Sequence, residues 1–348
     1  GYQEMPTNTL TDEILTPGKG QIRALIVNGG NPALVFSDTE HTLKALDDLD
    51  LLVVNDLFMS ATAKHADYVM AIKHPFERVD IPMLSDNYYP FSFSQYTEKM
   101  VEAEDDVIEE WELFWKLAQR MDSGFSLPGI PAEANPDADD VIRALTPDAR
   151  ITLDELKAAP PSGQAYDDRI PDVGGVIPDM IGYADRRLAV GHPEVIEELA
   201  EVLAEPVIDT GAYKKDDSFD FRLITYRMPE VYCTTGNNLP SLRRKRQYNP
   251  ALMNREDMSR LSLQDEDLVS IESGHGSIEA VVECSDRLAP GTVALAHGWA
   301  DPADDRPTRE KGSNVQALIP RDVDYDRITG LAQQSAFAVN IRPQSSPA

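Results

Sequence analysis

Two apolar runs near the start of the chain constrain its fold more than any other feature. Residues 22–27 form the first run, which ends at the turn Asn28-Gly29-Gly30-Asn31-Pro32. Residues 49–54 form the second run, which ends at Asn55-Asp56, and residues 39–46 between the runs have helical spacing. Two strands joined by a helical crossover make a parallel βαβ unit, in which ligands bind at the carboxyl ends of the strands. We therefore expect an α/β domain with polar strand-end loops.

Further elements should complete this first domain, which we expect to cover residues 1–125. Residues 62–64 suit a short helix, and residues 66–70 have the pattern of a third strand. Residues 105–121 place apolar side chains, among them two tryptophans, at helical spacing. Packing against the sheet is the favoured role of these tryptophans, so one face of the helix should be core.

The composition changes twice in the rest of the chain. Residues 126–208 are rich in Pro, Asp, Ala and Gly, which favours a connector, and short helices are expected at 139–145 and 153–158 with a longer one at 193–203. From residue 209 to residue 348, short strands alternate with turns, and strands are expected at 221–226, 268–272, 277–283 and 292–297. Gly274-His275-Gly276 is a hairpin signal between two of them. The last segment should therefore fold as a compact β-barrel.

Charge and cysteine content exclude several functions. The chain has 60 acidic and 32 basic residues, a formal charge of −28, which disfavours binding to nucleic acid or to a membrane surface. It has no apolar run of about 18 residues, so we expect no membrane insertion. Cys233 and Cys284 are too few for an iron–sulfur cluster or a four-cysteine zinc site. The start at Gly1, without a Met and close to a strand, favours the middle of a longer polypeptide.

The sequence offers places to hold a ligand and no motif for independent catalysis, such as a P-loop or an HExxH helix. Amides near Gly29 and Gly30 could bind phosphate, and Asp56 could accept hydrogen bonds from a ribose or guanine; a structural turn is the alternative. Residues 234–240 are rich in short polar side chains and precede Arg243-Arg244-Lys245-Arg246. Four clustered cations suggest an anionic partner such as a diphosphate, or else a solvated loop or an intersubunit salt bridge.

Two more polar residues follow the predicted barrel strands. His297 ends an apolar run, where it could face a ligand or be a satisfied histidine at the barrel rim. Asn314 follows Lys311-Gly312-Ser313 in a turn, where its amide could bridge backbone groups or recognise a heterocycle. Neither residue decides the function by itself.

Taken in order, these segments resemble the C-terminal half of the molybdopterin oxidoreductases of the dimethyl sulfoxide reductase family, which includes formate dehydrogenases and nitrate reductases. Residues 28–32 are similar to the family's glycine-Asn-Pro turn, and residues 53–63 to its Asp-x-Phe-Met-Thr-x-Thr-Ala block, with Ser60 in place of a threonine. Ala71 stands where the family usually has a proline. The last third is similar to the family's dinucleotide-binding barrel at Thr225-x-Arg227, residues 235–240, residues 249–254, His297-Gly298-Trp299 and Asn314.

The resemblance implies a parallel-sheet, Rossmann-like α/β domain, a connector and a C-terminal β-barrel of the double-psi type. The first domain would hold the guanosine end of a pterin cofactor, with Asn28, Gly30, Asn31, Asp56 and Thr62. The barrel would close over the pterin and phosphates, with Thr225, Arg227, Thr235, Gly236, Asn237, His297 and Asn314. Backbone amides, amide side chains and arginine suit such a polyanionic ligand.

By the same resemblance, the cofactor would be bis-molybdopterin guanine dinucleotide with molybdenum or tungsten. The metal ligand and any 4Fe-4S cluster would belong to an N-terminal region outside this chain, and Cys233 lies in the wrong segment to be that ligand. The expected partners are that region of the same enzyme and an electron-transfer subunit, and the isolated chain should be inactive. Two alternatives remain open: a non-catalytic nucleotide-binding or assembly module, and a nucleic-acid contact through residues 243–246.

Overall fold

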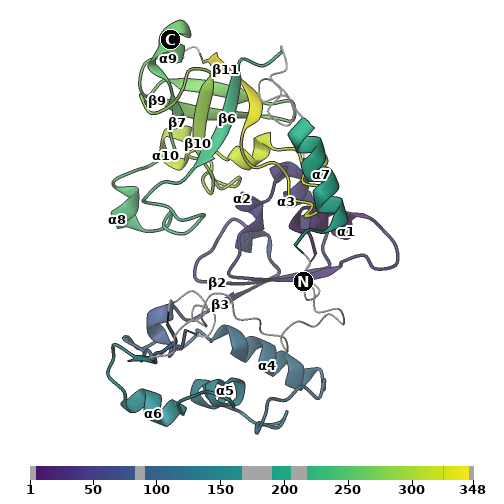
Figure 1. The fold of residues 1–348 in the computed structure, drawn as a ribbon, viewed down its shortest axis with the longest axis vertical. Helices are drawn as coiled ribbons and strands as arrows, with labels where there is room; N and C mark the ends of the chain where they lie inside the picture. Colours follow the sequence, from purple (N-terminus) through teal and green to yellow (C-terminus); the bar gives the residue numbers. More distant parts are fainter. Residues whose placement is uncertain (1–4, 83–90, 167–189, 205–217, 324, 345–348) are drawn as a thin grey trace. The chain divides into compact units, whose positions relative to one another are not determined.

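The computed structural model describes residues 5–82, 91–166, 190–204, 218–323 and 325–344. The chain forms two compact units, the first from Gly1–Val69 with Val190–Ala348 and the second from Met70–Ala189 (Figure 1). The first unit is thus built from the residues before and after the second unit in the sequence. Among the described residues, no helix combines the length and apolar character that crossing a bilayer requires.

A three-stranded sheet in the order β1-β2-β3 follows the first helices of the chain. Its strands are β1 (Ala24–Asn28), β2 (Leu51–Asp56) and β3 (Tyr68–Ala71). β1 and β2 pair in parallel, and α3 (Thr39–Asp47) is their crossover, so the predicted βαβ unit is confirmed. Both strands begin two residues later than predicted: the paired register starts at Ala24 and Leu51, and the amide of Leu51 donates to the carbonyl of Arg23 just before it.

Short helices cover one face of this sheet. They are η1 (Thr7–Thr9), α1 (Leu10–Leu15), α2 (Pro32–Val35), α3 and η2 (Ala63–His65). α2 begins with a proline, whose missing N–H costs nothing in the first turn. α3 begins after Asp38, whose carboxylate accepts a hydrogen bond from the amide of His41 at 3.1 Å. The buried core beneath these helices contains Val27, Ala33, Leu34, Leu46, Leu52, Val54, Ala61 and Ala63.

A closed six-stranded barrel with the strand order β10-β6-β11-β8-β9-β7 forms the rest of the first unit. Its strands are β6 (Phe221–Tyr226), β7 (Ala251–Met253), β8 (Leu268–Glu272), β9 (Ser277–Cys284), β10 (Thr292–Ala296) and β11 (Phe337–Pro343). β10 pairs with β6 and β7 with β9 in parallel, while the other pairs are antiparallel. The predicted barrel is confirmed, and β7 and β11 are strands that we did not predict.

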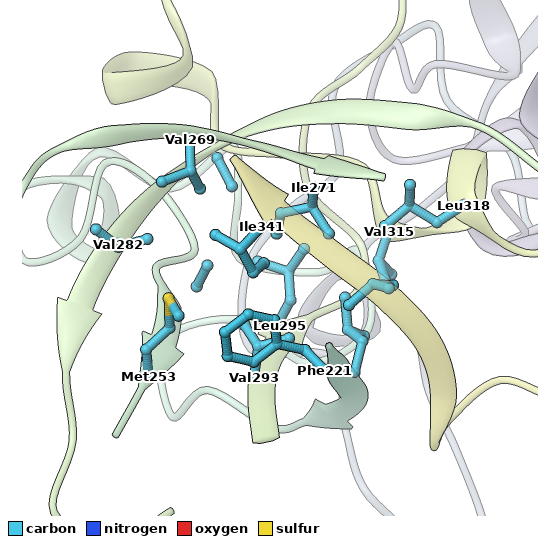
Figure 2. Close-up of a cluster of buried hydrophobic side chains, with 14 of the residues drawn as sticks. Phe221, Met253, Val269, Ile271, Val282, Val293, Leu295, Val315, Leu318 and Ile341 are labelled. Atoms are coloured by element: carbon cyan, nitrogen blue, oxygen red, sulfur yellow. The ribbon is translucent and has the colours of Figure 1, made fainter. Parts of the chain in front are cut away.

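Alternating side chains fill the barrel interior (Figure 2). In β8, for example, Val269 and Ile271 are fully buried, while the alternating Leu268, Ser270 and Glu272 are partly exposed. α9 (Arg255–Arg260) and η7 (Val315–Leu318) contribute Met258, Val315 and Leu318 to this interior. α8 (Pro240–Arg243) and α10 (Thr308–Lys311) lie in segments between strands, and α7 (Pro193–Ala204) precedes the barrel. Burying an aliphatic side chain contributes about 1.5–3 kcal/mol, so this interior holds the barrel loops in place.

Direct hydrogen bonds join the barrel to the sheet segment within the first unit. The amide of Asp38, just before α3, donates to the carbonyls of Gln316 and Ile319 at 3.1 and 2.9 Å. The Asn314 side chain donates to Thr39 Oγ1 at 3.1 Å. These hydrogen bonds hold the sheet segment next to the loops of the barrel.

The second unit contains α4 (Glu110–Arg120), α5 (Ala138–Leu145), α6 (Leu153–Ala158), η3 (Pro75–Glu77) and the strand pair β4 (Phe93–Ser94) and β5 (Gln164–Ala165). α4 is shorter than the predicted helix because Glu109 caps it with Glu112 in a reciprocal capping box. Trp115 is buried as expected, but Phe114 and Met121 are 44% and 75% exposed. The prediction of a fully core-facing stripe is therefore wrong for these two.

Candidate functional site

A cavity of about 240 Å³ lies in the first unit between the strand ends of the sheet and the loops of the barrel. On the sheet side it is lined by Gly29, Gly30, Asn31, Leu34, Asp56, Phe58, Met59, Ser60, Ala61 and Lys64. On the barrel side it is lined by Thr234, Thr235, Asn237, Asn238, Arg243, Ala300, Asp301, Asp304, Arg306 and Lys311. The two sets of loops that the sequence predicted to hold a ligand thus meet at one cavity.

The sheet side of the cavity is a tightly tied pair of strand-end loops. Gly29 has φ +62°, and its amide donates to the carbonyl of Asn55 at 2.9 Å, so the chain turns immediately after β1. Asn31 Oδ1 accepts hydrogen bonds from the amide and hydroxyl of Thr62 at 3.1 and 2.9 Å. Thr62 Oγ1 in turn accepts from the amide of Ala33 at 3.1 Å. Thr62 is fully buried, so its role in the structure is to connect the two loops.

Charged side chains make up seven of the twenty residues that line the cavity. The cations are Lys64, Arg243, Arg306 and Lys311, and the acids are Asp56, Asp301 and Asp304. The cations of this lining outnumber its acids, although the whole chain has a formal charge of −28. A concave surface with excess positive charge attracts an anionic ligand.

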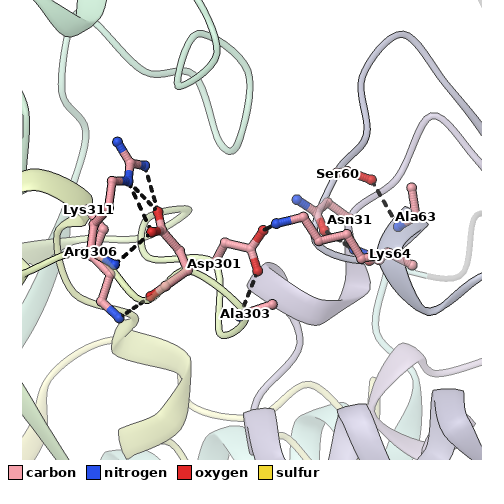
Figure 3. Close-up of polar contacts among 10 residues, drawn as sticks. Asn31, Ser60, Ala63, Lys64, Asp301, Ala303, Arg306 and Lys311 are labelled. Carbon is pink, nitrogen blue, oxygen red and sulfur yellow. Dashed lines mark hydrogen bonds and ion pairs between the residues drawn. The ribbon is translucent and has the colours of Figure 1, made fainter.

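Ion pairs already engage several of these charges (Figure 3). Lys64 Nζ lies 2.5 Å from Asp301 Oδ2, which links the sheet side to the barrel side. Arg306 binds Asp304 through both Nε and Nη2, with Nη2 at 2.6 Å. Hydrogen bonding from Arg306 lowers the pKa of Asp304 to about 2, so this carboxyl is ionised at neutral pH. Lys311 Nζ donates to the backbone carbonyl of Asp304.

Arg243 forms another part of the wall. Its guanidinium lies over the ring of Trp299 at 5.4 Å and donates to the carbonyl of Glu310. Burial, followed by the nearby Arg306, lowers the pKa of Arg243, although an arginine stays charged. The stacked ring excludes water from one face of the cation, and this strengthens its attraction for an anion.

A buried acceptor without a partner also lines the cavity. Asn237 Nδ2 donates to the carbonyl of Gly298 at 2.5 Å, while its Oδ1 is buried and accepts no hydrogen bond from any described residue. An unsatisfied buried acceptor costs about 1–3 kcal/mol, so a ligand donor at this point would recover stability. The Asn237 side chain is held by a backbone that only glycine permits, because a Cβ on Gly298 would lie 1.8 Å from the carbonyl oxygen of Cys233.

Of the predicted site residues, Gly30, Asn31, Asp56, Thr235 and Asn237 line the cavity. Those outside its lining are Asn28, Thr62, Thr225, Arg227, Gly236, His297 and Asn314. Asn28 Oδ1 accepts a hydrogen bond from Asn55 Nδ2 at 3.1 Å. Gly236 has φ +106°, and a Cβ there would lie 2.5 Å from the carbonyl oxygen of Glu230, so close backbone packing requires it.

The remaining predicted residues lie elsewhere in the barrel part of the first unit. The Thr225 amide donates to Ser335 Oγ at 3.0 Å, and Arg227 stacks over the exposed ring of Tyr232 at 5.3 Å. Burial, followed by the charge of Arg227, lowers the pKa of His297, so these two predicted residues lie near each other.

Asn314 caps η7, with its Oδ1 accepting from the amide of Gln316 at 3.0 Å and its Nδ2 donating to Thr39. Both groups of this amide therefore have partners within the protein.

Sequence reasoning missed several cavity residues, namely Lys64, Asp301, Asp304, Arg306 and Lys311. The last four follow β10 in an exposed loop and a short helix, where charged residues are ordinarily taken as solvated surface. A signal was nevertheless present, because they follow β10, which ends at Ala296, as the residues after Asp56 follow β2. Both are loops at the carboxyl end of a strand in a parallel pair.

Two family models match this chain, one on each side of the cavity. "Molybdopterin oxidoreductase" matches residues 3–120, and "Molydopterin dinucleotide binding domain" matches residues 221–336. The chain belongs to the molybdopterin oxidoreductase family. The resemblance inferred from the sequence is thus confirmed, and the chain is a molybdopterin dinucleotide-binding part of such an oxidoreductase.

Enzymes with different activities are similar in sequence to this chain. It is 24% identical to trimethylamine-N-oxide reductase of Haemophilus influenzae, over 85% of this chain and 40% of the relative. It is also 24% identical to formate dehydrogenase H of Escherichia coli, over 86% of this chain and 40% of the relative. The chain therefore spans about two fifths of the length of these relatives.

A solved structure with the same fold is acetylene hydratase from Pelobacter acetylenicus. The TM-score is 0.70 at 20% identity, over 96% of this chain and 46% of the other. At this identity the similarity establishes the fold, and the α/β sheet followed by a mixed barrel is the architecture expected from the sequence.

Proposed function

We propose that the cavity holds the diphosphate and adjoining nucleoside of a molybdopterin guanine dinucleotide, and that the chain acts within a bis-molybdopterin guanine dinucleotide enzyme of molybdenum or tungsten. The observation that carries this proposal is the meeting of two family-matched segments at one basic cavity. Phosphate requires cations and amide donors, and a guanine or ribose requires carboxylate and amide acceptors. The cavity provides both sets.

The residues of the cavity fit such a group in charge, polarity and size. The unpaired Oδ1 of Asn237 provides a buried acceptor for a ligand N–H or O–H. A volume of about 240 Å³ is at the small end for a ligand pocket, so it suits one portion of the dinucleotide. The described residues contain no group of three or more His, Cys, Asp or Glu placed to hold a metal ion.

Individual side chains take distinct roles in this proposal. Arg306 and Lys311 would bind the diphosphate, and Arg243 would add a second charge from the Trp299 side. Asp56 would accept hydrogen bonds from the ribose or guanine at the end of β2. The amide of Gly30 would approach the phosphates without steric hindrance from a side chain, while the amide of Gly29 stays bonded to the carbonyl of Asn55. When bound, the metal of the cofactor supplies oxygen-atom or electron-coupled transfer, for which the protein provides position and electrostatics.

Three of the predicted residues outside the cavity, Thr225, Arg227 and His297, would contact the pterin portion. Thr225 lies near the end of β6, and Arg227 and His297 directly follow β6 and β10, which pair in parallel. Their polar groups would extend the binding surface beyond the diphosphate. The metal ligand and any iron–sulfur cluster would be supplied by another region of the same enzyme, and electrons would pass to a further subunit. The relatives' greater length supports this division.

Binding of GDP to the purified chain, measured by isothermal titration calorimetry, tests the cavity. Arg306→Gln should weaken GDP binding about tenfold or more, because a charge-assisted hydrogen bond contributes about 1.5–3 kcal/mol. Arg309→Gln is the matched control, since Arg309 is exposed, lies in the next helix and does not line the cavity. Equal affinities in the two variants would contradict the placement of the diphosphate.

The alternative of a non-catalytic binding module has a separate test. Mass spectrometry and metal analysis of the natively purified protein should find a polypeptide with additional N-terminal residues, molybdenum or tungsten, and a pterin guanine dinucleotide. A natural 348-residue chain that carries a nucleotide and no metal would instead support the module. Oligonucleotide binding at low salt is expected to be absent, because the basic residues of segment 243–246 include Arg243 in the cavity and Arg246 paired with Glu283 at 2.8 Å.

A further inference from the structure

Protein acceptors engage all the cations that line the cavity. Lys64 is paired with Asp301, Arg306 with Asp304, and Lys311 and Arg243 donate to backbone carbonyls. An arriving anion must therefore replace an internal partner at one or more of these cations. An arriving anion should first bind the cation whose internal partner is easiest to replace.

The Lys64–Asp301 pair differs from the other contacts in its geometry. It is a single ion pair between residues 237 apart in the sequence, and the side chain of Lys64 is 39% exposed. Arg306 and Asp304 are two residues apart, and several hydrogen bonds join them, including one from the backbone amide of Arg306. Breaking the Arg306–Asp304 pair would also break the hydrogen bonds of the local turn. The Lys64–Asp301 pair is accessible to solvent, and a pair of this kind contributes about 0–1 kcal/mol.

Asp301 also organises the loop that carries it. Its Oδ1 accepts a hydrogen bond from the amide of Ala303 at 2.9 Å, and its carbonyl accepts one from the amide of Asp304 at 2.9 Å. Ala300, the preceding residue, has φ +57°, a conformation that costs an L-residue about 1–2 kcal/mol. Loop 300–304 is thus a tight turn, and the Lys64–Asp301 pair attaches it to the sheet side of the cavity (Figure 3).

We propose that Asp301 is an internal counter-anion of the cavity: its carboxylate occupies Lys64 until a phosphate group of the ligand takes that cation. The exchange would detach loop 300–304 from the sheet side, so ligand binding and the position of this loop are coupled. This inference rests on the proposed function for the identity of the ligand, but the exchange itself requires only a polyanion. Lys64 is therefore a residue that both closes the empty cavity and binds the anion.

The proposal predicts the sign of one substitution. Asp301→Asn keeps the size of the side chain and an acceptor oxygen for the loop turn, but it removes the competing charge from Lys64. Since an exposed ion pair contributes up to about 1 kcal/mol, inorganic pyrophosphate should bind the variant about fivefold more tightly than the unmodified chain. The gain should decrease as salt is raised, because screening weakens both the pair and its competitor.

Three further variants, all measured by calorimetry with pyrophosphate, isolate the effect. Asp305→Asn removes the same charge from the same loop, but Asp305 is exposed and does not line the cavity, so its affinity should change less than twofold. Lys64→Met should weaken binding. Asp301→Asn should give no gain when it is added to Lys64→Met, because the cation that Asp301 neutralises is absent.

Each result has a defined meaning. A pyrophosphate affinity that is unchanged or weaker in Asp301→Asn would overturn the counter-anion role, as would a gain equal to that of Asp305→Asn or a persistent gain in the double variant. The absence of pyrophosphate binding in every variant would also overturn it. Tighter pyrophosphate binding in Asp301→Asn with no GDP binding in any variant would uphold the exchange and reject the nucleotide assignment. The two proposals can therefore fail separately.

Discussion

Replacing Asn249 with alanine should destabilise the two segments that carry the barrel side of the cavity. Asn249 is fully buried, and its Nδ2 donates to the carbonyls of Ala296 and Ser313 at 2.6 and 2.9 Å. Its Oδ1 accepts from the amide of Ser313 at 2.7 Å. Ala296 ends β10, and Ser313 follows α10, the helix that carries Lys311. One amide side chain therefore fastens together the two segments that flank the charged loop.

The expected loss follows from the groups left without partners. Asn249→Ala would leave two buried carbonyl oxygens and one buried amide unsatisfied, at about 1–3 kcal/mol each. We expect a loss of about 3–5 kcal/mol in the free energy of unfolding of the first unit. Asn340→Ala is the matched control, because the amide of Asn340 makes similar bonds to Ser218 and Asp220 where water can replace them, and it should cost about 1 kcal/mol or less.

Urea unfolding monitored by tryptophan fluorescence measures this difference. The chain has 3 tryptophans, and replacing Trp111 and Trp115 with phenylalanine leaves the buried Trp299 as a reporter of the barrel side. The background variant serves as reference for both alanine substitutions. A loss for Asn249→Ala that does not exceed the loss for Asn340→Ala would refute the argument that this buried amide holds the loops together.

Two other predictions concern the same loops. Gly298→Ala should cost about 3 kcal/mol or more and abolish GDP binding, because the added Cβ would meet the carbonyl oxygen of Cys233. Gly291→Ala, with a similar φ of +78° and open space around it, should cost about 1 kcal/mol, and thermal unfolding of the two variants measures the difference. Burial and then Arg227 lower the pKa of His297, so unfolding takes up a proton, and stability contributed by the neutral ring should fall as the pH drops below about 6.5. His297→Gln should flatten the dependence of the melting temperature on pH below about 6.5, and an unchanged slope would contradict this assignment.

Much of the fold was predictable because its strands and helices follow local sequence patterns, such as side-chain alternation and capping residues. β6 and β8 have the predicted bounds, since alternating side chains in a barrel must point inward and outward. α6 also has the predicted bounds, because Thr152 and Glu155 form a capping box at its start. In contrast, β7 has three residues, and β11 includes Asn340 and Pro343, so neither had a clear strand pattern.

The candidate site was only partly predictable because its charges meet through the tertiary fold. Asp56 and Asn237 followed from local patterns, a strand end and a polar turn. Lys64 and Asp301 are in contact across 237 positions of sequence, and no local pattern indicates such a pair. The predicted domain limits at residues 125 and 208, and the contacts of Arg227 and His297 with the pterin, stay predictions. The start of the chain, residues 1–4, and two parts of the predicted connector, residues 167–189 and 205–208, lie outside the described residues.

The distance between Lys64 and Asp301 along the chain also fixes when the cavity can come into existence. A ribosome completes the sheet wall early and adds Asp301 only 237 residues later. A nascent chain that has passed β2 would present half of a receptor, with a basic residue and two glycines open to water. A ligand that needs both walls of the cavity can consequently bind only after synthesis has passed Lys311 and β11 has closed the barrel.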